Sequence, residues 1–256
     1  MKNRIILVLA TTLLLHVNPL VFANGSPETA VTQPKVIVFD VNETLLDLGN
    51  MRQSVGAALN GQEDLLPLWF STMLHYSLVV SATEDYKSFG AIGVAALQMV
   101  AEINGIAITQ EQAKTAVLTP LRSLPAHPDV AEGLAELKAQ GYKLVTLTNS
   151  SLEGVKSQLE NSGLSQYFDA NLSIESVGAF KPHLSTYQWA IKELAVNPDE
   201  ALMVAAHGWD IAGADKAGMQ TAFIRREGKV LFPLADQPDY NVNDVKNLAD
   251  KLAKFK

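Results

Sequence analysis

Hydrophobic and polar positions divide this chain of 256 residues into two kinds of segment. Short apolar runs that end abruptly in polar residues are typical of strands buried in a parallel sheet. Longer segments in which apolar residues recur three or four positions apart are typical of helices with one buried face. From Asp129 onward the two kinds alternate, which predicts an α/β fold with a doubly wound parallel, Rossmann-like sheet and right-handed crossovers. We expect helices over 130–140, 152–162, 184–194 and 211–218, and strands over 143–147, 170–174, 202–205 and 221–224.

A helical block precedes this alternation, over residues 51–118. Apolar residues between Leu65 and Tyr76 recur at spacings of three and four, residues 92–103 are almost all apolar, and no strand-like alternation is evident. A helical block inserted after the first strand would lie over the strand ends as a cap, enclosing a site and excluding water. The apolar segment Ala91–Val100 suits the interior of this cap, and it suits a homodimer interface as well.

The first 23 residues have the three parts of a secretory signal peptide. Lys2 and Arg4 supply a positive start, Ile5–Leu15 is apolar, and Val21–Ala23 ends in a small residue suited to cleavage. The alternative is an uncleaved membrane anchor, but the apolar run is shorter than the roughly 20 residues that a spanning helix needs. We therefore expect a periplasmic or secreted protein that begins near Asn24 and has no stable membrane association after processing.

Charge and composition exclude several classes of function. The whole chain has a net charge of −7, and loss of the signal peptide would leave 18 basic and 27 acidic residues. A negative protein of this kind is a poor partner for nucleic acid. Cysteine is absent, which excludes disulfides, thiol catalysis and cysteine-based metal sites. The five histidines form no cluster along the chain, so we expect no transition metal.

The most informative polar residue is Asp40, which ends the apolar run 36–39. In open α/β sheets ligands bind beyond the carboxyl ends of the strands, so a carboxylate at this place is a candidate nucleophile. Asp is also a favoured helix N-cap, and that alternative suits Asp40 when it is considered alone. Three later segments repeat the pattern of an apolar, strand-like run that ends in polar residues: 144–150, 179–182 and 201–210.

The four segments, taken in order, resemble the motifs of the haloacid dehalogenase superfamily over nearly the whole mature chain. The resemblance rests on Phe-Asp-x-x-x-Thr-Leu from Phe39, Leu-Thr-Asn-Ser from Leu147, Phe-Lys-Pro from Phe180 and Ala-His-Gly-Trp-Asp from Ala206. Within the superfamily these motifs are most similar to the L-2-haloacid dehalogenase branch. The alternative branch is that of the magnesium-dependent phosphatases.

Two positions favour the dehalogenase branch. The phosphatases carry a metal-binding Asp two residues after the nucleophile and another in the fourth motif, whereas this chain has Asn42 and Ala206 there. Mg²⁺ needs hard oxygen ligands, and Asn42 cannot act as a general acid. Dehalogenation needs neither, because the halide leaves as a stable anion. The resemblance then implies that Asp40 attacks C2 of a 2-haloacid and that water hydrolyses the resulting ester.

The resemblance also implies roles for the other motif residues. Thr44 would orient the nucleophile, Thr148 and Asn149 would bind the substrate carboxylate, and Lys181 would steady the charge of Asp40. The remaining two are Trp209, a wall of the pocket, and Asp210, which would activate water or hold Lys181. Each residue has a structural alternative, since Thr44 and Asn149 suit turns or caps, Trp209 suits the core, and Asp210 suits an N-cap before Ile211.

Four positions depart from the family pattern. Asn42 replaces a usual Tyr, Ala205 a usual Ser, and His207 a common Asn. In the cap, the dehalogenases place an Arg after a Leu-Trp pair to bind the leaving halide, and this chain has Phe70 at that position. Loss of the guanidinium removes a strong anion donor, which His207 could partly replace because an imidazole can donate to an anion. We expect Asn42, His207 and Phe70 to line the substrate pocket.

The sequence therefore predicts an exported hydrolase that acts without metal or cofactor on a small-molecule carboxylate, a 2-haloacid. A phosphatase-like hydrolase and a non-catalytic anion-binding protein remain as alternatives. A homodimer is compatible with the sequence. The expected divisions are a signal peptide at 1–23, a linker at 24–34, a core formed by 35–50 and 119–256, and a helical cap at 51–118.

Overall fold

The computed structural model describes residues 32–255. The predicted signal peptide at 1–23 and most of the linker lie outside these residues. The described chain contains one six-stranded parallel sheet in the order β3-β2-β1-β4-β5-β6, so the predicted doubly wound fold is confirmed. Its strands are β1 (Val36–Phe39), β2 (Lys143–Thr148), β3 (Ala170–Ser173), β4 (Ala201–Ala205), β5 (Gln220–Ile224) and β6 (Tyr240–Val242).

The central strands are apolar along their whole length because helices cover both faces of the sheet. All residues of β1, β4 and β5 are buried. The chain builds the sheet outward from β1 through β2 to β3, and then crosses to the other side of β1 to begin again at β4. The strand order therefore reverses between β1 and β4, and the loops that leave these two strands diverge there.

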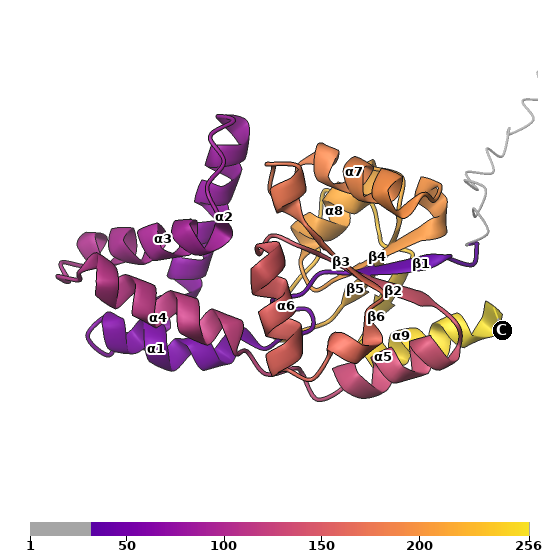
Figure 1. Cartoon of the computed structure of the whole chain (residues 1–256), viewed down its shortest axis with the longest axis horizontal. Coiled ribbons are helices and arrows are strands. Elements are labelled where there is room, and N and C mark those ends of the chain that lie inside the picture. The colour runs from indigo at the N-terminus through magenta and orange to yellow at the C-terminus, as the bar shows by residue number, and fades with distance from the viewer. Residues whose placement is uncertain (1–31, 256) are drawn as a thin grey trace, which may run out of the picture. The chain divides into compact units, whose positions relative to one another are not determined.

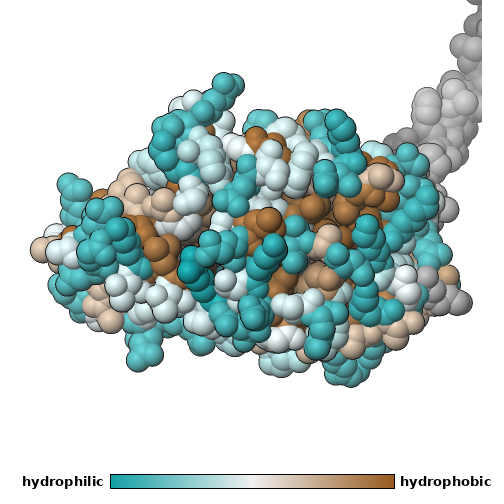
Figure 2. Space-filling view, viewed as in Figure 1, coloured by the Kyte–Doolittle hydropathy of each residue, from teal (hydrophilic) through white to brown (hydrophobic). Residues whose placement is uncertain are grey.

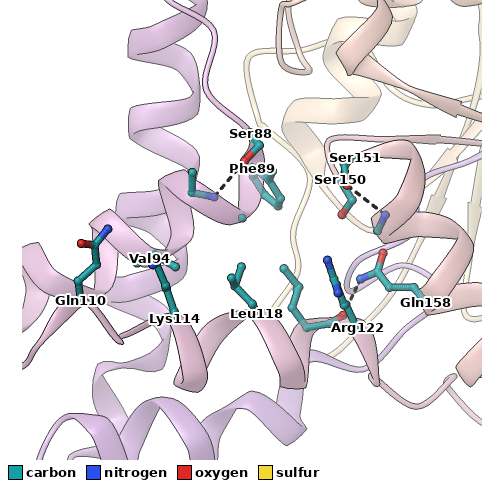
Figure 3. A pocket seen from close by; sticks show the side chains of 14 residues that line it. Ser88, Phe89, Val94, Gln110, Lys114, Leu118, Arg122, Ser150, Ser151 and Gln158 are labelled. Atoms are coloured by element: carbon teal, nitrogen blue, oxygen red, sulfur yellow. Dashed lines mark hydrogen bonds between the residues drawn. The ribbon is translucent and has the colours of Figure 1, made fainter. Parts of the chain in front are cut away.

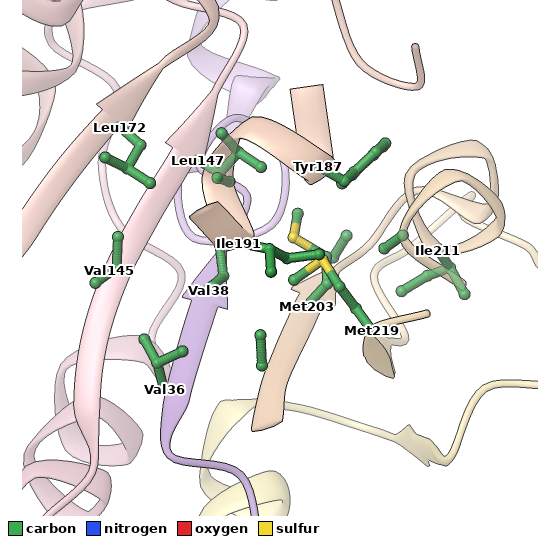
Figure 4. Close-up of a cluster of buried hydrophobic side chains, with 14 of the residues drawn as sticks. Val36, Val38, Val145, Leu147, Leu172, Tyr187, Ile191, Met203, Ile211 and Met219 are labelled. Atoms are coloured by element: carbon green, nitrogen blue, oxygen red, sulfur yellow. The ribbon is translucent and has the colours of Figure 1, made fainter. Parts of the chain in front are cut away.

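Two layers of helices flank the sheet (Figure 1). One face is covered by α5 (Val130–Ala139) and α9 (Val245–Leu252), and the other by α7 (Leu184–Leu194) and α8 (Gly208–Lys216). The helix α6 (Leu152–Asn161) packs beside β3. Under α7 and α8, alternate residues of β1, β2 and β4 meet the apolar sides of both helices (Figure 4). This cluster includes Val36, Val38, Val145, Met203, Tyr187, Ile191 and Ile211.

Between β1 and α5 the regular elements are all helical, as the sequence pattern predicts. The longer ones are α1 (Met51–Ala58), α2 (Leu66–Ala82), α3 (Phe89–Ile103) and α4 (Gln110–Arg122). Each of the last two begins after an N-cap residue whose side chain bonds to the first turn: Ser88 accepts from Ala91 N, and Thr109 forms a capping box with Gln112. We call these four helices the cap. It continues to Arg122, four residues beyond the boundary expected at 118.

Short 3₁₀ turns link several of these elements. They lie at Leu48–Asn50, Glu63–Leu65, Ser165–Tyr167, Ile174–Ser176, Pro198–Glu200 and Ala253–Phe255. The strand β6 and the helix α9 complete the sheet and its cover, and they follow the last element that the sequence pattern predicted. Three residues of β6 give too short an apolar run to stand out from a loop.

The cap helix α2 exposes part of its apolar surface. Residues 63–82 form a helix long and apolar enough to cross a membrane by length and composition, although Trp69, Phe70 and Met73 are buried within the fold. Hydrophobic residues reach the surface between hydrophilic ones in Figure 2. Most of Ala91–Val100 is buried in α3, so this segment belongs to the interior of the cap.

Three local predictions are wrong. The run 179–182 is a loop, because its backbone groups bond to side chains instead of a strand: Phe180 N donates to Ser81 Oγ and Ala179 O accepts from Thr186 Oγ1. The helix expected from Ile211 begins at Gly208, which places Asp210 in the first turn instead of at an N-cap. The strand expected to include Ile174 ends at Ser173, whose side chain caps a 3₁₀ turn.

Candidate active site

Asp40 lies directly after β1, at the point where the strand order reverses. Its backbone N–H donates to Val204 O of β4, which continues the parallel pairing for one residue beyond the strand. The side chain is 5% exposed. The end of β1 therefore presents a buried carboxylate to the loops that follow the strands and to the cap.

Lys181 joins Asp40 to Asp210. Its Nζ is 2.9 Å from Asp40 Oδ1 and 2.6 Å from Asp210 Oδ2, and all three side chains are buried. The backbone of the loop that carries Lys181 is fixed by Asn149, whose Oδ1 accepts from Lys181 N at 3.0 Å. Lys181 thus connects Asp40 to Asn149 of the second predicted motif and to Asp210 of the fourth.

Thr44 holds the other oxygen of Asp40. Its hydroxyl donates to Asp40 Oδ2 at 2.6 Å and accepts from Ala206 N at 2.9 Å. Because the hydroxyl oxygen already accepts from a backbone N–H, its own hydrogen is directed at Asp40. Arg226 donates to Thr44 O and pairs with Asp129 through two hydrogen bonds, which connects this loop to the segment after β5 and to the start of α5.

His207 lies between two carboxylates. Its Nδ1 is 3.2 Å from Asp40 Oδ2, and its Nε2 is 2.9 Å from Glu43 Oε2. Lys229 pairs with Glu43 Oε1 at 2.6 Å. The sequence analysis did not select Glu43 or Lys229. Glu43 stands only three residues after Asp40 and could have been suspected, whereas Lys229 follows the turn 227–228 and has no signal in the chain.

Two aromatic rings enclose this histidine. Trp209 stacks on His207 with ring centroids 4.7 Å apart, and Phe70 of α2 lies over it at 6.4 Å. Both aromatic residues predicted for the pocket therefore contact the site. Because each ring nitrogen of His207 already faces a carboxylate, His207 has no unengaged N–H to offer a halide in this arrangement, contrary to the role suggested for it from the sequence.

Tyr187 is a further member of the site that the sequence analysis missed. Tyr187 lies in the first turn of α7. Its hydroxyl donates to Asp210 Oδ1, and the two oxygens are 2.6 Å apart. Gly213 permits this approach, since a Cβ there would lie 2.7 Å from the Tyr187 ring. In the sequence Tyr187 is one apolar position of an amphipathic helix, and only the packing of α7 on α8 turns its hydroxyl toward Asp210.

The three residues predicted to bind the substrate, Asn42, Thr148 and Asn149, form hydrogen bonds with other residues of the chain. Asn42 donates to Ser150 Oγ at 3.3 Å and accepts from Gln158 Nε2 at 2.8 Å. Thr148 Oγ1 accepts from Ser150 N. Asn149 uses Oδ1 for Lys181, and within residues 32–255 its Nδ2 has no hydrogen-bond partner. Of the three, Asn149 retains the donor most available to a ligand.

The charges of the site are set by burial and by mutual pairing. Burial alone would raise the pKa of Asp40, but Lys181 and His207 hold that pKa well below its usual range. Burial would lower the pKa of His207, but Asp40 and Glu43 raise it to about 9. Three carboxylates, Asp40, Glu43 and Asp210, thus face three cations, Lys181, His207 and Lys229.

Asp210 has the opposite electrostatic character. Burial is the main cause that raises its pKa, and the negative charge of Asp40 adds to the effect, while Lys181 opposes it. Burial and the neighbouring Asp210 also raise the pKa of Tyr187 well above its usual value, so Tyr187 keeps its proton and donates. A carboxylate with a raised pKa is the better proton acceptor of the two near Lys181.

The donor set does not suit Mg²⁺. A magnesium ion requires several free oxygen ligands in octahedral geometry. Both oxygens of Asp40 and both oxygens of Asp210 accept from Lys181, Thr44, His207 or Tyr187, and the carbonyl oxygen of Asn42 accepts from Gln158. In the described part of the chain, no group of three or more His, Asp and Glu residues could hold a metal ion. The magnesium-phosphatase alternative thus lacks its ligands.

A cavity of about 340 Å³ lies between the cap and α6. Figure 3 shows Phe89, Val94 and Leu118 of the cap on one side and Ser150 and Gln158 of the core on the other. Ser150 and Gln158, which are the two hydrogen-bond partners of Asn42, are among its lining residues, as are Lys114 and Arg122. The cavity therefore adjoins the partners of Asn42, and neither Asn42 nor Asp40 lines it.

Known proteins match nearly the whole described chain. The family model for haloacid dehalogenase-like hydrolases matches residues 34–218. The (S)-2-haloacid dehalogenase 4A of Burkholderia cepacia is 31% identical over 225 residues, which cover 86% of this chain and 93% of the relative.

Solved structures give the same relationship. A dehalogenase whose crystal structure includes an intermediate complex is 28% identical, has a TM-score of 0.80, and is covered over 99% of its length by 87% of this chain. The L-2-haloacid dehalogenase of Xanthobacter autotrophicus with covalently bound chloropropionic acid has a TM-score of 0.80 at 24% identity, with coverage of 87% and 100%. This second likeness shows a common fold.

Proposed function

This chain belongs to the haloacid dehalogenase-like hydrolases, and we propose that it hydrolyses the carbon–halogen bond of (S)-2-haloacids through an ester on Asp40. The family expected from the four sequence motifs is confirmed. The observation that carries the proposal is the state of Asp40: a buried carboxylate, kept ionised by Lys181, at the reversal point of the sheet. An ionised carboxylate is the form that attacks carbon.

The first step forms one bond and breaks one. Asp40 Oδ1 attacks C2 of the substrate, the bond from C2 to the halogen breaks, and its electron pair leaves with the halide. Within the described residues Oδ1 accepts from one donor, Lys181, whereas Oδ2 accepts from both Thr44 and His207, so Oδ1 is the better nucleophile of the two oxygens. The free Nδ2 of Asn149 is available to hold the substrate carboxylate.

The missing guanidinium at Phe70 is offset by the charge balance of the site. When Asp40 becomes a neutral ester, the three cations Lys181, His207 and Lys229 face only two carboxylates, Glu43 and Asp210. The site thereby gains one positive charge at the moment the halide departs. In a buried site such a charge is weakly screened, so it stabilises the leaving anion without a dedicated donor.

Hydrolysis of the ester completes the cycle. Asp210 takes a proton from a water molecule while the oxygen of that water attacks Cγ of Asp40. The bond between Cγ and Oδ1 then breaks, and its electron pair stays on Oδ1, which becomes the hydroxyl oxygen of the hydroxyacid. Asp210 returns its proton to that oxygen, and Asp40 releases the second proton of the water to regain its carboxylate. The products are the 2-hydroxyacid, the halide and one proton. Tyr187 and Lys181 hold Asp210 in place for this exchange.

The test is halide release from L-2-chloropropionate by the purified chain, with and without EDTA, followed by a single turnover in ¹⁸O-water. We expect release that ignores EDTA and ¹⁸O that enters the Asp40 carboxylate. Release with ¹⁸O only in the product would contradict an ester on Asp40. Thermal stabilisation by the acid without any product would instead favour the non-catalytic, anion-binding alternative.

The proposal includes the cellular setting. The signal peptide expected at residues 1–23 supports export, and the net negative charge argues against nucleic acid as a partner. The exposed apolar residues Leu68, Leu78 and Val79 of α2 are compatible with a homodimer. Cell fractionation and N-terminal sequencing test export, and sedimentation of the mature protein tests its oligomeric state.

A further inference from the structure

His207 is held more firmly than a residue of the pocket wall requires. Both ring nitrogens face carboxylates, Asp40 at 3.2 Å and Glu43 at 2.9 Å, and the ring stacks with those of Trp209 and Phe70. The ring is 6% exposed. Its Nδ1 is consequently fixed toward one oxygen of Asp40, the oxygen that Thr44 also contacts.

The partner of His207 adopts a costly backbone conformation. Glu43 has a φ of 62°, in the left-handed region where a residue with a side chain is disfavoured by roughly 1–2 kcal/mol. The conformation turns the carboxylate of Glu43 back over the site, where it accepts from His207 and pairs with Lys229. His127 bonds to Glu43 O and secures the same turn.

The loop that carries Lys229 packs against Gly208, the residue that follows His207. A Cβ on Gly208 would lie 2.6 Å from Val230 O and 2.8 Å from Phe232 N, so the backbone of this loop touches the residue next to His207. Lys229 Nζ also lies 5.8 Å from the centre of the Phe70 ring. Three separate segments, after β1, β4 and β5, thus combine to fix one imidazole.

The two oxygens of Asp40 have different surroundings as a result. Among the donors of residues 32–255, Lys181 alone bonds to Oδ1, while Oδ2 accepts from Thr44 at 2.6 Å and from His207 at 3.2 Å. An ester formed through Oδ1 leaves Oδ2 as its carbonyl oxygen. Attack of water at Cγ then moves the π electron pair of the carbonyl onto Oδ2, the atom at which two donors already point.

We propose that His207 and Thr44 form an oxyanion hole for hydrolysis of the Asp40 ester, and that Glu43 and Lys229 are positioning residues that keep His207 as the donor. This inference rests on the proposed function and assigns the second half of its reaction. The negative charge on Oδ2 is stabilised by Nδ1–H of His207 and the hydroxyl of Thr44, then returns to the carbonyl as the ester bond breaks. Donors fixed before the reaction stabilise such an anion without reorganisation.

The charges around His207 favour a donor over a base. The groups that face it are Asp40 after β1, Glu43 in the next turn and Lys229 after β5, while Lys181 and Asp210 lie on the far side of Asp40. From the cap, the uncharged ring of Phe70 lies over it. While Asp40 is ionised, Asp40 and Glu43 raise the pKa of His207 to about 9, so both of its nitrogens carry a proton at neutral pH. Once Asp40 is an ester, Glu43 is the carboxylate that still favours the protonated ring.

The main experiment separates formation of the ester from its hydrolysis. His207→Gln is mixed with L-2-chloropropionate, quenched at short times, and assayed for halide and for the mass of the modified chain. We expect a burst of halide close to the enzyme concentration and accumulation of the ester, because hydrolysis slows by about 10²–10³-fold while ester formation changes much less. His75→Gln, an exposed residue of α2, serves as the control.

Equal slowing of both steps, or an ester that never accumulates although the wild-type protein forms it, would overturn the inference. Failure of the proposed function has a different signature, because the wild-type protein would then form no ester at all.

A second measurement requires neither substrate nor turnover. Ring ¹⁵N NMR of His207 should show both nitrogens protonated at pH 7 in the wild-type protein. Glu43→Gln should lower the pH at which His207 loses its proton by about one unit or more, since an opposite charge shifts a pKa by about that amount. Glu84→Gln is the matched control, because Glu84 also has a positive φ, 56°, and is exposed. A neutral ring at pH 7 would overturn the inference independently of halide release.

Discussion

Two adjoining regions of this protein handle charge in opposite ways. At the end of β1, three carboxylates and three cations are buried or nearly buried and bond to one another. In the cavity under the cap, the cations Lys114 and Arg122 are exposed and pair with Glu111 and Glu153 at the surface, while Phe89, Val94 and Leu118 supply apolar walls. The first region suits chemistry on a charged group, and the second suits admission of a small acid.

The comparison also explains how Phe70 can stand near the nucleophile. A cation on α2 would join a site whose charges already balance, beside His207 and Lys229. An aromatic ring at that position instead packs over His207 and carries no charge. The buried region is therefore specialised by its network, and the cap contributes shape and exclusion of water more than charge.

The largest effect is expected from loss of the nucleophile. Asp40→Asn should reduce halide release to background, because an amide cannot form the ester, while circular dichroism and the thermal midpoint show a folded protein. Asp250→Asn, an exposed change in α9, should leave release unaltered. Substantial turnover by Asp40→Asn would eliminate the buried region as the site of reaction.

Removal of the central cation tests the balance of charges. Lys181→Met leaves Asp40 and Asp210 without their common partner, and breaking a buried ion pair in this way costs about 3–5 kcal/mol. We expect a loss of that order in the free energy of unfolding measured with urea. The exposed Lys156→Met should change stability little, and a similar small change for Lys181→Met would mean that the network does not stabilise the fold.

The stability of the buried region should depend on alkaline pH. His207 has an ordinary pKa of 6.5 and a folded-state pKa of about 9, so its contribution is complete below pH 6.5 and is lost as the pH rises through 9. The loss amounts to about 3 kcal/mol. Urea unfolding between pH 6 and 10 measures it, and His207→Gln should flatten the curve. A wild-type curve already flat between pH 6 and 9 would contradict a charged His207.

Phe70→Arg asks whether the cap can be given a charge of its own. A guanidinium here would approach the leaving halide, and we expect release from L-2-chloropropionate to rise by about tenfold, a fraction of the value of a fully preorganised donor. Phe70→Leu controls for the lost ring. Unchanged or lower release by the Arg variant, relative to Leu, would show that the network already supplies all the anion stabilisation that the reaction uses.

The smallest effect is expected at the cavity. Leu118→Trp fills part of the space between α4 and α6 and should raise KM a few-fold with little change in kcat, because it hinders entry and leaves the chemistry intact. Leu184→Trp, at an exposed position of α7, is the control. Equal KM values for the two variants would mean that the substrate reaches Asp40 by another route.

The sequence alone determined the sheet and the family. Apolar runs such as 36–39 and 202–205 are buried on both faces, and this leaves a pattern that composition and period reveal without any tertiary contact. Asp40 could be identified because it ends an apolar run of a parallel sheet, where ligands bind. Thr44, Lys181 and Asp210 were assigned because their motifs resemble those of the family. The cap was recognisable by helical period, although the end of α4 was not.

Only the tertiary structure determined which further residues complete the site. Lys229 and Tyr187 are ordinary in the sequence, one after a turn and one on a helix face, and they reach Glu43 and Asp210 because loops and helices from distant segments pack together. The run at 179–182 resembles a strand until its backbone finds Ser81 and Thr186. Local pattern records burial and period, whereas the choice of partner for a polar group depends on distances that the folded chain alone sets.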